Sequence, residues 1–119
     1  MKRSKSEAGI LGEALAREYL QKRKCNIVDH NFRCAMGEID LVVRKDRAFR
    51  FVEVKYRTTP EYGLPQESVV RSKQRRIRNA AIVWLKNRRL PIDTEVHFDV
   101  MAITEFAGQR KYEYIEDAF

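Results

Sequence analysis

The chain of 119 residues carries 24 lysine and arginine residues against 17 aspartate and glutamate residues, a formal net charge of +7 at pH 7. This length supports one domain with a single hydrophobic core. With 44% hydrophobic and 34% charged residues, the composition is that of a soluble globular protein and gives no sign of disorder. The basic balance favours polyanionic partners, with nucleic acid first and acidic membrane surfaces or acidic proteins behind it.

Neither export nor membrane insertion is expected. Basic residues precede an apolar stretch at the N-terminus, as in a secretory signal, but Glu7, Glu13 and Glu18 interrupt that stretch. No segment reaches the roughly 18 consecutive apolar residues of a membrane-spanning helix. The two cysteines, Cys25 and Cys34, are too few for a disulfide scaffold, and their spacing fits neither a zinc ribbon nor a redox pair. We therefore expect a cytoplasmic protein with reduced thiols and no membrane partner.

The first half of the chain predicts a helix followed by three strands. Residues 4–7 fit a capping box, and apolar residues recur at helical spacing to about residue 24. A short strand is expected over residues 25–33. Two further strands, EIDLVVR and FRFVEVKYR, flank a charged turn at residues 46–47 and so predict a hairpin.

The second half predicts a loop, a helix and two strands. Residues 58–66 contain two prolines and a glycine, which predicts a loop beside the charged strand ends. Ser72 is expected to cap a helix that ends near Arg89. Alternation in EVHFDVMAI and KYEYI, on either side of a turn at residues 107–108, predicts the last two strands.

The central hairpin is apolar on both of its expected faces, with Ile39, Leu41 and Val43 on one and Val42 and Phe51 on the other. A strand that is apolar on both faces is covered on both, so helices should flank the sheet. We expect a single α/β domain over residues 1–119, with a mixed central sheet flanked by helices in the order α-β-β-β-α-β-β.

Three charged residues interrupt this apolar hairpin. With a two-residue turn at residues 46–47, Asp40 lies opposite Glu53, and Lys55 lies two residues further along on the same face. A three-residue turn would instead put Asp40 on the other face. Carboxylates about 5 Å apart on an apolar face are unfavourable. Three arrangements would relieve them: a divalent metal bridges them, Lys55 neutralises one, or one stays protonated. Mg²⁺ or Mn²⁺ suits the first arrangement, because these cations prefer carboxylate oxygens and retain water and phosphate ligands.

The expected second helix is strongly basic. Its region contains eight basic residues and no acidic one: Arg71, Lys73, Arg75, Arg76, Arg78, Lys86, Arg88 and Arg89. Solvated helices usually mix both signs of charge, so a face of one sign is interpreted as a polyanion-binding surface. We expect the first five of these residues to bind nucleic acid, with DNA as the favoured partner.

Five motifs then carry a resemblance that spans residues 12–103: GEALAREYL, GEIDLVV, FVEVKYR, SKQRRIRNAA and HFDVMAI. With them the chain resembles the PD-(D/E)XK nuclease superfamily and, more closely, the small bacterial YraN-like family, which is similar in its core to archaeal Holliday junction resolvases. The resemblance implies a restriction-endonuclease-like α-β-β-β-α-β core. It also implies a PD-(D/E)XK nuclease-like domain that hydrolyses DNA, with branched or damaged DNA as the substrate.

The same resemblance assigns roles to residues of the hairpin. It makes Asp40 and Glu53 metal-binding carboxylates, adds the backbone carbonyl of Val54 as a further ligand, and makes Lys55 the catalytic lysine. Where the superfamily name has proline before the aspartate, this chain has Ile39.

The resemblance also assigns residues on the two helices. Glu13 matches a first-helix acid that contributes to a second metal or a metal-bound water, and Gln74 matches a polar residue that helps arrange the site. Because junction resolvases work as symmetric dimers, a homodimer is implied. Two other functions stay open beside the nuclease: a non-catalytic nucleic-acid-binding module in repair, recombination or processing, and a basic adaptor for an acidic protein.

Overall fold

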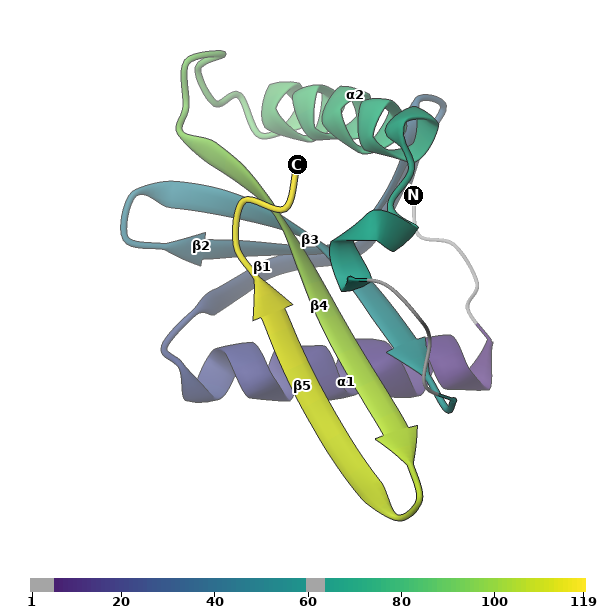
Figure 1. The fold of residues 1–119 in the computed structure, drawn as a ribbon. Coiled ribbons are helices and arrows are strands. Elements are labelled where there is room, and N and C mark those ends of the chain that lie inside the picture. Colours follow the sequence, from purple (N-terminus) through teal and green to yellow (C-terminus); the bar gives the residue numbers. More distant parts are fainter. Residues whose placement is uncertain (1–5, 60–63) are drawn as a thin grey trace.

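The computed structural model describes residues 6–59 and 64–119, and it places a five-stranded sheet between two helices (Figure 1). The elements follow in the predicted order, with a short 3₁₀ helix added in the expected loop: α1 (Glu7–Lys22), β1 (Asn26–Cys34), β2 (Gly37–Lys45), β3 (Ala48–Arg57), η1 (Pro65–Ser68), α2 (Arg71–Asn87), β4 (Val96–Phe106) and β5 (Gln109–Ile115). The α/β fold with a mixed sheet flanked by helices is confirmed.

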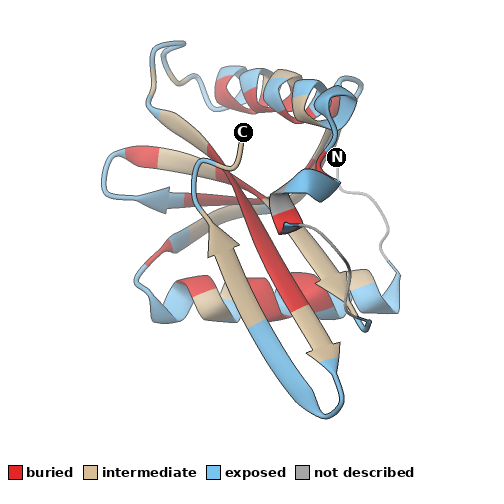
Figure 2. Cartoon of the chain, in the orientation of Figure 1, coloured by how far each residue is buried: buried red, intermediate tan, exposed pale blue. Residues whose placement is uncertain are grey.

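The strands lie in the sheet in the order in which they occur in the chain. Neighbouring strands are antiparallel except β3 and β4, which are parallel and are connected through α2. A parallel pair requires a crossover across one face of the sheet, and α2 provides it. As a result α2 covers one face and α1 covers the other, while the tip of the β4–β5 hairpin extends away from both helices and is exposed (Figure 2).

Helix α1 begins two residues later than a capping box at residues 4–7 would place it. Ser6 is the N-cap, and its hydroxyl accepts a hydrogen bond from the backbone N–H of Gly9 at 3.1 Å. Ser4 lies outside the described residues. The apolar face of α1 forms a core cluster with the sheet: Leu15, Ala16, Leu20, Cys25, Leu41, Val43, Val52, Met101 and Ile103.

Helix α2 begins without a side-chain cap. Its N-cap is Val70, which makes no side-chain capping bond, so the prediction that Ser72 caps this helix is wrong; Ser72 lies inside the first turn. Packing against the sheet stabilises the helix without a cap, because Ile77, Ala80, Ala81, Trp84 and Leu85 are buried. Trp84 contacts the rings of Phe49 and Phe51 edge-on and donates its indole N–H to Asp29 at 2.9 Å.

Ile39 lies on the other side of the sheet from where alternation placed it. It packs in the cluster under α2, with Phe32, Val42 and Phe51, and not with Leu41 and Val43. The ladder between β2 and β3 ends at Leu41, whereas β2 remains paired with β1 as far as Gly37. Beyond Leu41 the end of β2 therefore bends with β1 toward α2, and Ile39 follows it.

The sheet consequently divides at one end. The turn between β1 and β2 lies beside the start of α2, whereas the end of β3 runs toward the start of α1 (Figure 1). A glycine permits each approach. A Cβ on Gly37 would lie 2.7 Å from the backbone oxygen of Arg76, and a Cβ on Gly12 would lie 2.7 Å from the Cβ of Tyr56.

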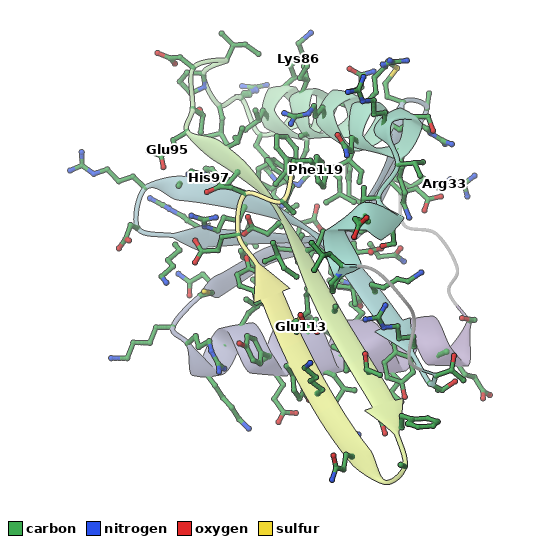
Figure 3. The ribbon with its side chains drawn as sticks, viewed as in Figure 1. Arg33, Lys86, Glu95, His97, Glu113 and Phe119 are labelled. Carbon is green, nitrogen blue, oxygen red and sulfur yellow. The ribbon has the colours of Figure 1, made fainter. Side chains whose placement is uncertain are left out.

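The C-terminal residues pack beneath α2 (Figure 3). The Phe119 ring stacks on Phe98 with centroids 5.5 Å apart, and the guanidinium of Arg78 lies over both rings. One residue earlier in this segment, the backbone N–H of Ala118 donates to the carbonyl of Phe98 at 2.7 Å. His97 also contacts this C-terminal segment, because the carboxylate of Asp117 lies 2.6 Å from its imidazole Nδ1.

Both cysteines are free, as predicted: Cys25 is buried and Cys34 is half-buried. Within the part of the chain that the structure describes, no helix combines the length and the apolar character needed to span a membrane.

Candidate functional site

The site lies where β2 and β3 separate. Their register confirms the predicted two-residue turn at residues 46–47 and runs regularly to the pair Leu41 and Val52. The next opposed residues would be Asp40 and Glu53, as the sequence predicts, but the ladder has ended there. Instead, the carboxylate of Asp40 accepts the backbone N–H of Val54 at 2.9 Å. The side chain of Asp40 thus takes the place of a backbone carbonyl of β2 as the acceptor for Val54. Both carboxylates lie in the opening where β2 and β3 separate.

Two cavities open on either side of these carboxylates. Asp40, Glu53 and Lys73 line both cavities. The α2-side cavity, about 270 Å³, is lined by Glu38, Asp40, Glu53, Ser72, Lys73, Arg76 and Ile77. The α1-side cavity, about 340 Å³, is lined by Ser6, Ala8, Gly9, Gly12, Asp40, Glu53, Val54, Lys55, Tyr56 and Lys73. The opening in the sheet is therefore accessible from the starts of both helices.

The two carboxylates are held in a poorly solvated position. Asp40 is 5% exposed, and the side chain of Glu53 is 11% exposed. Burial, followed by the nearby charge of Asp40, raises the pKa of Glu53 to about 7, and Lys73 acts in the opposite direction. Lys73 forms an ion pair with Glu53 from α2. Of the arrangements expected to relieve the carboxylates, neutralisation by an ammonium is present, but the ammonium belongs to Lys73 and not to Lys55.

Lys55 lines the α1-side cavity together with both carboxylates. Asp40, Glu53 and Lys55, which the sequence placed on one face of the hairpin, thus line one cavity. Across the described ranges 6–59 and 64–119, no three side chains among His, Cys, Asp and Glu gather in positions that could hold a metal ion. A cation bound here would rely on two carboxylates, a backbone carbonyl and non-protein ligands, a set that suits hard cations such as Mg²⁺.

Two predicted site residues lie elsewhere. Glu13, buried on α1, points its carboxylate toward the imidazole of His30 at 3.3 Å. Gln74 donates its side-chain amide to the carbonyl of Val69 at 2.9 Å, and so it holds the segment that leads into α2. Among the described residues that line the two cavities, neither Glu13 nor Gln74 occurs.

The predicted nucleic-acid-binding residues divide into three groups. Lys73 and Arg76 face the α2-side cavity. Arg71 and Arg75 are exposed on the helix surface. The guanidinium of Arg78 lies 4.7 Å from the centroid of the Phe98 ring, so this residue packs against the C-terminal segment.

The interaction of Lys73 with Glu53 was not anticipated from the sequence, although the sequence contains a signal for it. Lys73 precedes Ile77 by four residues and Ala80 by seven, so it extends the buried stripe of α2 by one turn toward the helix start. A lysine on such a stripe points to the sheet. Glu38 and Ser72 also line the α2-side cavity.

Comparison with known proteins identifies relatives along nearly the whole chain. The family model described as "Uncharacterised protein family UPF0102" matches residues 12–103. A UPF0102 protein of Geobacter sulfurreducens is 44% identical over 112 residues, which cover 93% of this chain and 87% of the relative. A UPF0102 protein of Clostridium perfringens is 40% identical over 121 residues, covering 100% of this chain and 98% of the relative. By both the family model and these relatives, the chain belongs to the UPF0102 family.

Proposed function

We propose that this UPF0102 protein is a divalent-metal-dependent nuclease of the PD-(D/E)XK type, which hydrolyses phosphodiester bonds in DNA. One observation carries the proposal: Asp40, Glu53 and Lys55 line one cavity at the point where the sheet divides. Two neighbouring carboxylates with little solvent exposure, one of them paired with an ammonium, line cavities on both sides. Such a cluster is more typical of a functional site than of a structural ion pair.

The residues present fit a hard divalent cation. Two neighbouring carboxylates require a positive charge close to them. In this structure the ammonium of Lys73 supplies that charge through its ion pair with Glu53, where a bound metal cation would also supply it. Asp40 and Glu53 would hold Mg²⁺ or Mn²⁺, with the carbonyl of Val54 as a further ligand. Bound there, the cation supplies a water of lowered pKa and neutralises charge on the phosphate.

The side chains of the protein have separate roles in this proposal. Lys55, in the α1-side cavity, donates to a phosphate oxygen and stabilises the charge that builds during displacement. Arg76, in the α2-side cavity, and the exposed Arg71 and Arg75 bind phosphates along the backbone of the nucleic acid.

Cleavage assays test this function. Purified protein is incubated with Mg²⁺ or Mn²⁺ and with branched, single-stranded or duplex DNA. Metal-dependent cleavage is expected with at least one substrate, and Lys55→Ala should remove it while DNA binding remains. Lys86→Ala is the matched control, because Lys86 projects from α2 away from the sheet (Figure 3). Cleavage retained in Lys55→Ala would refute the role of this lysine.

A non-catalytic nucleic-acid-binding module is the second candidate. The ion pair between Lys73 and Glu53 favours it, because it neutralises a carboxylate without any metal. This module would bind DNA with the salt dependence of phosphate contacts and show no cleavage with either metal on any of the three substrates. A basic adaptor for an acidic protein would instead show little salt-sensitive affinity for DNA.

A further inference from the structure

We propose that Lys73 is an internal competitor for the metal site: it occupies Glu53 when no divalent cation is bound and leaves it when one binds. This inference rests on the proposed metal site at Asp40 and Glu53. It assigns to Lys73 a role in setting the affinity of the site for metal, besides contact with nucleic acid.

The two partners of this ion pair are unequal in solvent exposure. The side chain of Lys73 is 53% exposed, whereas that of Glu53 is 11% exposed. The lysine stem therefore reaches the carboxylate from the surface, and its ammonium can withdraw into water without disturbing the core. Glu53 lies on a strand that is paired with β4 and has no comparable freedom.

The ammonium of Lys73 has space in the cavities for a second position, away from Glu53. It lines both of them, and the α2-side cavity also contains Ser72 and Arg76. An ammonium and a divalent cation cannot share the same carboxylate oxygens, because their charges repel and their volumes overlap. Lys73 that has left Glu53 would lie beside Arg76, where both can bind phosphate oxygens of a substrate.

Competition of this kind weakens the observed affinity for metal. Mn²⁺ binding, measured from the free-ion signal in electron paramagnetic resonance, should be tighter by about tenfold in Lys73→Met than in wild type, since a charge-assisted bond no longer has to be broken. Arg76→Met is the matched control: it removes one positive charge from the same cavity but leaves the ion pair between Lys73 and Glu53 in place. Its affinity should change by less than about threefold.

A measurement on the wild-type protein covers the case in which Lys73→Met does not fold. Titration with Mg²⁺ should shift the Cε and Hε resonances of Lys73, while those of Lys86 on the outer face of α2 remain unchanged. Unmoved Lys73 resonances at saturating metal would overturn the proposal.

The outcomes separate this inference from the proposed function. Equal Mn²⁺ affinity in wild type, Lys73→Met and Arg76→Met, with binding abolished in Asp40→Asn, would overturn the competition and leave the metal site in place. No Mn²⁺ binding in wild type or in Lys73→Met would overturn both.

Discussion

The Glu53 carboxylate on β3 lies between two residues of opposite effect: Asp40 on β2, whose charge raises the pKa of Glu53, and Lys73 on α2, which forms an ion pair with it. Burial is the larger cause of the raised pKa, the charge of Asp40 adds to it, and the resulting pKa is about 7. An ionised carboxylate in this position is therefore held at a cost in folding free energy. Such a cost is typical of sites selected for chemistry and not for stability.

Glu53→Gln should stabilise the protein at alkaline pH. The folded-state pKa of Glu53 lies above its ordinary value of 4.5, so the favourable contribution of the protonated form is fully present below 4.5 and is lost as the pH rises through about 7. A neutral isostere avoids that loss. At about pH 8 the free energy of unfolding should increase by as much as ~3 kcal/mol, and at about pH 4 the difference should vanish.

Urea denaturation at the two pH values measures this effect. Glu18→Gln is the control, because Glu18 is exposed and, within residues 6–59 and 64–119, pairs with Lys22 one turn along α1, an interaction worth a few tenths of a kcal/mol. A Glu53→Gln variant that is less stable than wild type at about pH 8 would contradict the prediction.

Replacing Arg75 and replacing Arg78 should have different effects on stability and on DNA binding, although both are exposed arginines of α2. Arg78→Ala removes a guanidinium from the rings of Phe98 and Phe119 and should lower the free energy of unfolding by about 1 kcal/mol. Arg75→Ala should change it by less than about 0.5 kcal/mol. Under the proposed function, Arg75→Ala should instead weaken DNA binding and reduce the dependence of log affinity on log salt by about 1.

Thermal unfolding and DNA titrations at several salt concentrations distinguish the two variants. Equal losses of stability in Arg75→Ala and Arg78→Ala would show that the stacking of Arg78 contributes nothing.

His97 should make the stability of the C-terminal segment pH-dependent. Hydrogen bonds with Glu95 and then with Asp117 raise the pKa of His97, against burial and the charge of Arg50, which lower it. Because the folded-state pKa is raised, the stabilisation is fully present below the ordinary value of 6.5 and is lost as the pH rises through the folded value. His97→Gln should lack this loss.

Unfolding of wild type and His97→Gln across that range, with an NMR titration of the His97 ring, measures the effect. Asp117→Asn removes one of the two carboxylates and should lower the pKa of His97. An identical pH dependence in wild type and His97→Gln would exclude this role for the imidazole.

The sequence was sufficient for the hairpin and for the three charged residues on it. A charged two-residue turn sets the register, and alternation then fixes which residues share a face, so Asp40, Glu53 and Lys55 could be placed together without coordinates. These are local rules: the pairing is regular as far as Leu41 and Val52, and Asp40 and Glu53 are the next residues along the two strands.

The same rules fail where pairing ends. Alternation places Ile39 with Leu41, but the end of β2 bends with β1 toward α2 and carries Ile39 into the other cluster. The contact between Lys73 and Glu53 depends on how α2 docks across the divided sheet, which no local pattern specifies. The position of Gln74, bonded to Val69, depends on the same docking.

Gly37→Ala should disturb the site from a distance. Its Cβ would lie 2.7 Å from the backbone oxygen of Arg76, and backbone cannot turn aside as a side chain can, so α2 or the end of β2 must shift. The free energy of unfolding should fall by about 1–3 kcal/mol, and the NMR resonances of Lys73, in the same helix turn, should move. Gly108→Ala is the matched control, because a Cβ on Gly108 would meet no atom within 4 Å but the residue has a φ of +76°. This substitution should lower the free energy of unfolding by about 1 kcal/mol without shifting the Lys73 resonances. Unchanged Lys73 resonances in Gly37→Ala would show that the docking of α2 does not depend on this contact.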